Sequence, residues 1–320
     1  MKCRFLRRKQ KSSTAILLLL CLHGIATAQD LRLSFHHLSS EEGLSHAQTH
    51  LVYQDSYGFV WIGTDEGLNR FDGQYVAHFP PASSGFSSGN ISSRCFEDLD
   101  KNLWFSTAAE IVCYRRATGR FESFRPPLPD VTGLIAFYLD VEGDLWVKAG
   151  VGEQGSLYLF NLQNNQYRRL GLLQGACFEV VADANKRVTH VVAGKLPNGA
   201  GGITLTDVNN WKIDTVKFDQ TAYGETRRYS SPAKNILVEG DSVIWVGVYD
   251  GLGKYNLKQH KSVALLDRTA SVKSNFGWVF DIAPYDKTRL LAACGDGLKV
   301  FDTQRNKFVQ EFCYQPKMPG

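Results

Sequence analysis

The stretch that decides the fold is DSYGFVWIGTDEGLNRFD, at residues 55–72. An Asp followed three residues later by Gly is a hairpin-turn signature, because Gly58 supplies a positive φ and the Asp55 side chain bonds back to the backbone. The segment FVWI alternates in the manner of a β-strand, and Gly67-Leu68 after two polar residues opens a second hairpin. The stretch therefore predicts three short strands joined by two tight turns.

This unit recurs along the chain. It returns as DLDKNLWFST at residues 98–107, DVEGDLWV at 140–147 and VIWVGVYDGL at 243–252. A worn copy at 183–189 has Thr189 in place of the tryptophan, and a sixth copy at 290–302 keeps only the second half. The tryptophan-equivalent positions are 61, 104, 146, 189, 245 and 291, with spacings of 43, 42, 43, 56 and 46. Such a period, with four short strands per unit, predicts an all-β β-propeller of four-stranded blades with six repeat units visible.

The repeat also predicts the parts of a blade. In the first blade we expect strands at 48–54, 59–64, 68–72 and 74–79, followed by a loop at 80–88 that crosses to the next blade. The long spacing of 56 indicates an insertion around 209–231, too short to hold another blade, and helical periodicity is absent after residue 28. One set of residues recurs at the same blade position, which predicts structural core: Trp61, Trp104, Trp146 and Trp245.

The two ends of the repeat region leave two alternatives. Residues 31–37, LRLSFHH, precede the first inner strand where a fourth strand would lie, and Lys307–Phe312 is expected to be the fourth strand of the sixth copy. Propellers usually close by letting a terminal strand complete the last blade. The sequence is then either an incomplete seven-bladed ring, which we favour, or six closed blades with residues 31–37 left over.

The first 28 residues have the pattern of an export signal. Six basic residues precede Ser12, an apolar run follows at 15–22, and Ala26-Thr27-Ala28 matches a small-residue cleavage site. This pattern indicates a secretory signal peptide at 1–28, with an uncleaved anchor as the alternative. The domain prediction is therefore a propeller at 29–320, truncated before its last blade is complete, located in the periplasm or outside the cell.

Composition excludes several classes of protein. The formal charge is +4, but the six leader residues account for it, and the remaining 30 basic and 32 acidic residues give about −2. A body with mixed charges lacks the basic footprint of a nucleic-acid-binding protein. The chain is 43% hydrophobic, which excludes disorder. The cysteines beyond the leader match no zinc spacing, so we interpret them as small buried hydrophobic residues: Cys95, Cys113, Cys177, Cys294 and Cys313.

The repeat unit, in which an Asp, a Gly, a Trp, a Gly-Thr pair and a Gly-Leu pair recur at fixed spacing, strongly resembles the two-component regulator propeller repeat. The preceding LSSEEGLS at residues 38–45 resembles the entry segment of those proteins. The resemblance implies an exported sensor propeller of the kind common in Bacteroidetes, where a second propeller, an immunoglobulin-like domain, a membrane helix and a histidine kinase or DNA-binding output usually follow. It also implies that the ligand is an oligosaccharide. The given sequence shows no kinase or ATP-binding motif, so we expect this chain to bind without catalysing a reaction.

Propellers usually bind ligands at the mouth formed by the loops between blades and between the second and third strands. Aromatic faces, carboxylates, amides and arginines in such loops suit a sugar. Trp278 departs from the blade pattern and is the strongest single candidate, although it could instead fill the funnel. The full set of candidate ligand-binding residues is Trp278, Tyr249, His46, Asn90, Arg227, Arg228, Asp65, Glu66, Asp250, Asn275 and Asp296.

Metal and catalytic sites are not expected. His46 and His50 span a strand start, where a four-residue spacing does not align side chains as it does on a helix. The run Asp98-x-Asp100-x-Asn102 mimics a calcium loop but lacks its glycine and glutamate, and we interpret it as the hairpin turn of the second blade. The sequence shows no Ser-His-Asp signature or phosphate loop, and no cofactor is predicted.

Three functions stay open at this point. The first is a sensor module for an oligosaccharide or another small polar ligand. The second is a secreted propeller lyase or glycoside hydrolase, because a fold alone does not fix a function. The third is a protein-interaction propeller. Partners expected for a sensor are a second propeller and membrane-signalling domains, with a homodimer as a further possibility and no nucleic acid.

Overall fold

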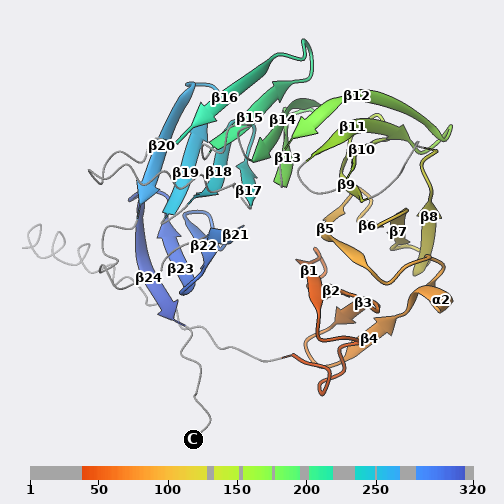
Figure 1. The fold of residues 1–320 in the computed structure, drawn as a ribbon. Helices are drawn as coiled ribbons and strands as arrows, with labels where there is room; N and C mark the ends of the chain where they lie inside the picture. The colour runs from red at the N-terminus through yellow and green to blue at the C-terminus, as the bar shows by residue number, and fades with distance from the viewer. Residues whose placement is uncertain are drawn as a thin grey trace, which may run out of the picture. The chain divides into compact units, whose positions relative to one another are not determined.

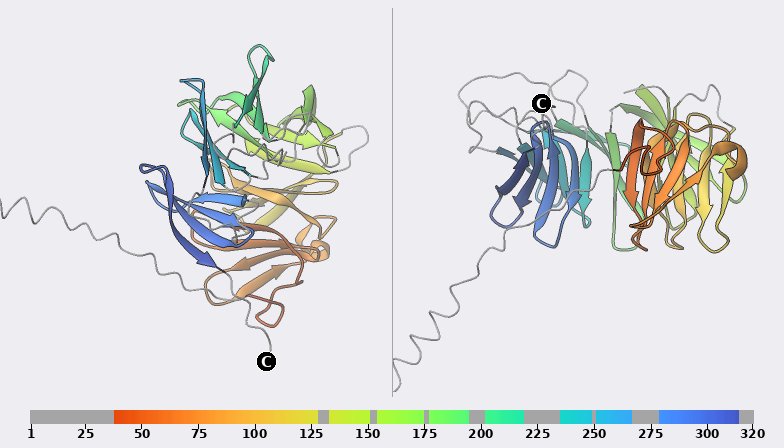
Figure 2. Two further views of the ribbon diagram at one scale, coloured as in Figure 1. Left: turned by 60° about the vertical axis from the view of Figure 1, so that its left-hand side comes forward. Right: turned by 90° about the horizontal axis from the view of Figure 1, so that it is seen from below.

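The computed structural model describes residues 38–127, 133–150, 154–174, 177–194, 202–218, 235–248, 251–266 and 279–313. These residues form six antiparallel sheets of four strands, in which consecutive strands are neighbours. Figure 1 shows the first strand of every sheet, which we call the inner strand, facing a common centre, and Figure 2 shows the sheets stacked side by side. The predicted all-β propeller with six four-stranded blades is confirmed.

The blades follow the chain in order. Blade 1 consists of β1(Thr49–Gln54), β2(Val60–Thr64), β3(Gly67–Phe71) and β4(Val76–Phe79). Blade 2 consists of β5(Ile91–Glu97), β6(Leu103–Thr107), β7(Ile111–Arg115) and β8(Arg120–Phe124). Blade 3 consists of β9(Leu134–Leu139), β10(Asp144–Ala149), β11(Gln154–Asn161) and β12(Gln166–Gln174). Blade 4 consists of β13(Cys177–Ala182), β14(Val188–Gly194), β15(Gly202–Asp207) and β16(Ile213–Lys217). Blade 5 consists of β17(Ile236–Glu239), β18(Val243–Val248), β19(Gly251–Asn256) and β20(Lys261–Leu266). Blade 6 consists of β21(Val279–Pro284), β22(Arg289–Cys294), β23(Gly297–Asp302) and β24(Lys307–Cys313).

Two predictions of local structure need correction. The crossing after blade 1 is not all loop, because Pro81–Ser84 forms the short helix α2, which starts with proline and ends at Gly85 with φ 87°. The insertion expected around 209–231 is also misplaced, because its first part is β16, the ordinary fourth strand of blade 4. Strand β24 confirms the predicted last strand of the sixth copy. Residues 1–37, which include the predicted signal peptide, lie outside the described residues.

The core consists of layers between blades. The described residues form five hydrophobic clusters, and each joins one blade to the next along the chain. Trp61, Trp104 and Trp245 have no exposed surface and Trp146 is 5% exposed, which confirms them as core. Among the described residues no helix is long and apolar enough to cross a membrane.

The repeated Asp accepts a hydrogen bond from the repeated Trp. The indole N–H of Trp61 donates to the Asp55 carboxylate at 2.7 Å, and equivalent bonds of 2.8 to 3.0 Å join Trp104 to Asp98, Trp146 to Asp140, and Trp245 to Glu239. In blade 1 the other carboxylate oxygen accepts the backbone N–H groups of residues 57 and 59, so the same side chain closes the turn. One acidic residue therefore fixes both the turn and the large core side chain of its blade.

Blade 1 adds an ion pair to this bond. The Asp55 side chain has no exposed surface and pairs with Arg116 of blade 2 at 2.8 Å, while Arg116 also contacts Glu97 at 3.3 Å. Burial alone would raise the pKa of Asp55, but the hydrogen bonds from Trp61 and Arg116 outweigh it and hold the pKa below its usual value. The bond within one blade is thus linked to the neighbouring blade.

Small residues two positions after the tryptophan let the next inner strand approach. A Cβ at Gly63 would lie 2.8 Å from Ile91 Cγ2 in blade 2, and a Cβ at Gly247 would lie 2.9 Å from the Val279 carbonyl oxygen in blade 6. Blade 2 has Ser106 at this position, and its hydroxyl accepts the Ala136 N–H of blade 3 at 2.9 Å. The glycine of the repeat therefore serves the packing between blades.

The indole bond is tested by a matched pair of substitutions. Asp140 and Asp183 each accept two backbone N–H groups in equivalent turns, but Asp140 also accepts the Trp146 indole, whereas blade 4 has Thr189 there. We expect Asp140→Ala to lower the free energy of unfolding by about 1–3 kcal/mol more than Asp183→Ala, because a buried N–H loses its acceptor. Urea denaturation measures both values, and equal losses would contradict this role for the indole bond.

The packing role of Gly63 has its own test. Gly63→Ala places a methyl group against Ile91, and we expect a loss of about 1–3 kcal/mol in the free energy of unfolding. Gly171→Ala is the control, because a Cβ at Gly171 in β12 meets no atom within 4 Å. That substitution should be neutral or slightly stabilising. Thermal and urea unfolding of the two variants check the prediction, and similar stabilities would refute the close approach.

Candidate functional site

Most of the predicted mouth lies outside the described residues. This holds for Trp278, Tyr249, Arg227, Arg228, Asp250 and Asn275. The other candidates are described and lie on two blades. His46, Asp65, Glu66 and Asn90 belong to blade 1 or its crossing to blade 2, and Asp296 occupies the turn between β22 and β23 of blade 6. The structure does not test whether any of them binds a ligand.

On blade 1 the structure brings two histidines to one carboxylate. His50 Nε2 lies 2.6 Å from one Asp65 oxygen, and His46 Nδ1 lies 3.9 Å from the other. A Cβ at Gly89 would lie 2.3 Å from the Asp65 carbonyl oxygen, so the crossing that carries Asn90 rests against this turn. Sequence reasoning missed the role of His50, because its partner Asp65 becomes adjacent only when β1 pairs with β2.

Asp296 has a different environment. Its carboxylate pairs with Lys299 at 3.1 Å, and Lys299 is 1% exposed and also bonds to Glu311 at 2.9 Å. Burial alone would lower the pKa of Lys299, but its bonds to Glu311 and Asp296 outweigh it and raise the pKa above the usual value. Asp296 therefore helps to stabilise a buried ammonium at the edge of blade 6.

A polar cluster crosses the centre of the molecule, and sequence reasoning did not predict it. The Arg94 guanidinium of β5 donates to the Phe178 carbonyl oxygen of β13 at 2.6 Å and forms an ion pair with Glu179. Both charged side chains are about one-quarter exposed. This contact joins the inner strands of blades 2 and 4 and passes over blade 3. It therefore spans the space around which the inner strands are arranged.

A second polar contact joins the inner strands of blades 5 and 6. The Asn235 amide, just before β17, donates to the Asp281 carboxylate of β21, which also accepts the Ile282 N–H at 2.8 Å. Burial by the surrounding protein raises the pKa of Asp281, and the positive charge of Arg94 partly offsets this. We call Arg94, Glu179, Asn235 and Asp281 the channel cluster.

The four residues of the channel cluster share one repeat position. Each lies four residues before the residue that starts the turn to the second strand, which is Asp98, Asp183, Glu239 or Tyr285. The other two blades have Leu51 and Ala136 at this position, and both pack into the clusters between blades. Aligning the inner strands on the turn would have revealed from the sequence that this position is apolar in blades 1 and 3 and polar in the other four.

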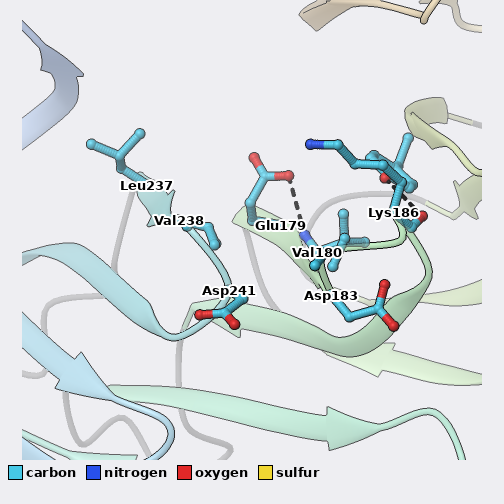
Figure 3. Close-up of a pocket in the computed structure, with 11 residues that line it drawn as sticks. Glu179, Val180, Asp183, Lys186, Leu237, Val238 and Asp241 are labelled. Atoms are coloured by element: carbon cyan, nitrogen blue, oxygen red, sulfur yellow. Dashed lines mark hydrogen bonds between the residues drawn. The ribbon is translucent and has the colours of Figure 1, made fainter.

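A pocket of about 540 Å3 opens beside the channel cluster. It lies on the side of the first-to-second-strand turns, opposite to the predicted mouth, and Glu179 borders it. Asp183 and Lys186 come from the turn of blade 4, and Asp241 comes from the turn of blade 5. Figure 3 shows the Lys186 ammonium and the Glu179 carboxylate directed into the same space. Apolar walls come from residues such as Val180 and Leu237.

The side chains that line the pocket offer both donors and acceptors of hydrogen bonds. Tyr138 donates its hydroxyl to the Lys186 carbonyl oxygen at 3.2 Å, and burial, followed by the nearby carboxylates, raises the pKa of this phenol. Carboxylates, one ammonium and apolar surface side by side can bind a polyhydroxylated ligand, in which hydroxyl groups alternate with C–H faces.

An acidic group on blade 3 could suggest a metal site. One oxygen each of Asp140, Glu142 and Asp144 lies within 4.8 Å of the others. However, Asp140 already accepts two backbone N–H groups and the Trp146 indole. The equivalent turn of blade 2 is built in the same way, because Asp98 accepts the Asn102 N–H, as expected of a hairpin turn.

The cysteines have mixed environments. Cys113 is buried, as predicted, and burial raises the pKa of its thiol to about 12. Cys95 and Cys294 are only partly buried. The side chains of Cys177 and Cys313 lie outside the described part of the chain.

Comparison with known families gives one match, at residues 43–66, to the two-component regulator propeller. These residues span β1, the first turn and β2, with Asp55 and Trp61 inside them. The chain carries a two-component regulator propeller repeat. The resemblance inferred from the repeat unit is confirmed. Comparison with curated protein sequences gives no match.

Several solved structures share the propeller fold. The extracellular domain of the hybrid two-component system BT3049 from B. thetaiotaomicron is 18% identical with a TM-score of 0.61, covering 88% of this chain and 37% of that one. The corresponding domain of BT4673 from the same organism is 19% identical with a TM-score of 0.61, and the match covers 83% of this chain and 36% of that one. Virginiamycin B lyase from Staphylococcus aureus is 14% identical with a TM-score of 0.59, and the match covers 84% of this chain and 85% of that one. This chain thus spans little more than a third of the two extracellular domains, and at these identities the likeness shows the fold alone.

The ion pair between Arg94 and Glu179 can be tested with a double-mutant cycle. We expect Arg94→Gln and Glu179→Gln to show a coupling energy of about 1–2 kcal/mol in the free energy of unfolding, because each single change leaves a partly buried charge unpaired. The exposed pair Arg115 and Glu122, 2.7 Å apart, is the control and should give less than about 1 kcal/mol. Equal coupling in both pairs would show that the bridge does not differ from a surface ion pair.

Proposed function

We propose that this chain is the ligand-binding sensor propeller of a two-component regulatory system and that it recognises an oligosaccharide. The observation that carries the proposal is the regulator propeller repeat at residues 43–66. Support at the level of the fold comes from the extracellular domains of two hybrid two-component systems. By the same reasoning the sensor acts in the periplasm or outside the cell, in agreement with the leader sequence at residues 1–28.

The site suits such a ligand for physical reasons. The channel cluster places charged and amide groups on inner strands, where each backbone is held by a four-stranded sheet. Groups held on rigid elements lose little conformational freedom when they bind. The ligand could enter from the mouth near Trp278 or from the pocket near Lys186, and these two routes require different residues.

A sensor needs its ligand to prefer one arrangement of the signalling protein over another. We propose that binding in the channel changes how this propeller meets a second propeller or a second copy of the chain. The chain itself would bind the ligand, and the output would come from membrane-signalling domains.

The second candidate function is that of a propeller lyase. The match with this chain covers 85% of virginiamycin B lyase, whereas it covers little more than a third of each extracellular domain. A lyase would return its ligand cleaved, and a sensor would return it intact.

The experiment is a thermal-shift screen of the purified chain against a panel of oligosaccharides. A ligand that binds only the native state adds about 2.7 kcal/mol to apparent stability at one hundred times Kd. We expect a shift with one glycan class, and chromatography should recover that glycan intact. Recovery of fragments would establish the lyase, and the absence of any shift across the panel would overturn the oligosaccharide sensor.

Two variants then locate the site. Trp278→Ala should abolish the shift if the mouth binds the glycan, and Lys186→Ala should abolish it if the pocket does. Lys186 lies outside the described core clusters, so Lys186→Ala should keep the melting temperature of the free protein, and we expect the same of Trp278→Ala. A large fall in that temperature with retained binding would contradict a binding role for the residue concerned.

A further inference from the structure

Among the described residues, the channel cluster and the pocket carry more carboxylates than cations. Their described carboxylates are Glu179, Asp183, Asp241 and Asp281, and their described cations are Arg94 and Lys186. Lys258 pairs with Asp241 at 2.6 Å from outside the pocket lining. Counting it still leaves one carboxylate more than the cations can neutralise.

Two of these carboxylates, Asp183 and Asp281, form no ion pair within the described residues. Glu179 is paired with Arg94, and Asp241 is paired with Lys258. Asp183 accepts the backbone N–H groups of residues 185 and 187. Asp281 accepts only neutral donors, namely the Asn235 amide and the Ile282 N–H, and within the described residues it forms no ion pair. Its side chain is nevertheless exposed to solvent, so a ligand can reach it.

The environment of Asp281 makes a positive partner favourable. Surrounding protein removes part of the water that would otherwise stabilise its charge, and this raises the pKa of the carboxyl group. A cation that binds beside it replaces that lost hydration. An anion in the same place would meet Glu179 and Asp281 together, with one guanidinium to offset both. We therefore expect sugars with a positive charge to fit the channel and sugars with a negative charge to be excluded.

We infer that the channel selects an amine-bearing oligosaccharide, whose ammonium group pairs with Asp281, and rejects oligosaccharides that carry carboxylate groups. This inference rests on the proposed function and deepens it, because it names the chemical class of the sugar. Arg94 and Glu179 then hold the hydroxyl groups of the same ligand, since guanidinium and carboxylate groups donate to and accept from hydroxyls.

The test compares three oligosaccharides of equal length by titration calorimetry, with the purified chain below the pKa of the sugar amine. The probes are a glucosamine tetramer, its N-acetylated counterpart and a galacturonic acid tetramer. We expect the amine form to bind at least about tenfold more tightly than the acetylated form, because a hydrogen bond to a charged group exceeds a neutral one by about that factor. The galacturonic acid tetramer should bind most weakly.

Two variants assign the preference to Asp281. Asp281→Asn keeps a side-chain oxygen for the Asn235 amide, so it should fold with a melting temperature near that of the parent while losing most of the preference for the amine. Asp214→Asn is the matched control, because Asp214 lies on the outer strand β16 and pairs with Lys212 at 3.0 Å. The control should keep the full preference.

The outcomes separate this inference from the proposed function. Tightest binding of the galacturonic acid tetramer, or an amine preference that survives in Asp281→Asn, would overturn the inference and leave the sensor intact. Failure of these three probes, with binding of another sugar from the wider panel, would also overturn it. Failure of every oligosaccharide would overturn the proposed function itself.

Discussion

The hydrogen bond from the blade tryptophan to the acidic residue six positions before it is the interaction on which the rest of this structure depends. It fixes the turn between the first two strands and the orientation of the largest core side chain at once. A buried indole N–H without an acceptor would be costly, so a blade that keeps the tryptophan also needs the acidic residue. Blade 5 supports this reading, because it keeps the tryptophan and has Glu239 where blades 1 to 4 have Asp. Blade 4 has lost the tryptophan, and there the Thr189 hydroxyl bonds to the Val181 carbonyl oxygen.

Packing between blades follows from this anchor. With the tryptophan held against one face of its sheet, a small residue two positions later lets the next inner strand approach, although blade 3 has the buried Lys148 at this position. Gly63, Ser106 and Gly247 meet that requirement in three blades. The repeat is thus conserved within the chain because each of its residues performs one step in joining a blade to its neighbour. The described core is accordingly divided into five clusters between consecutive blades.

This rigid arrangement leaves one position of the inner strand available for function. Leu51 and Ala136 use it for packing, whereas Arg94, Glu179, Asn235 and Asp281 turn it toward the centre with polar groups. β-Bulges lie beside this position in β1, β5 and β21, so a bulge accompanies the packing residue Leu51 as well as the polar residues Arg94 and Asp281. A propeller can in this way change its ligand without changing its fold. Within this cluster, the Asp281 carboxylate gives the channel its expected preference for an amine.

The sequence by itself determined the hairpin turns and the buried tryptophans, because each depends on a short local pattern, and the recurrence of that pattern gave the blade period and the six copies. It placed strand ends to within a residue or two, but it missed helix α2 and assigned β16 to an insertion. Only the tertiary structure decided the pairs Arg94 with Glu179, His50 with Asp65, and Asp55 with Arg116. Two of these join residues of different blades, and one joins residues brought together by strand pairing. The distance between such residues is set by the stacking of whole sheets or the register of a hairpin, and no local pattern records it.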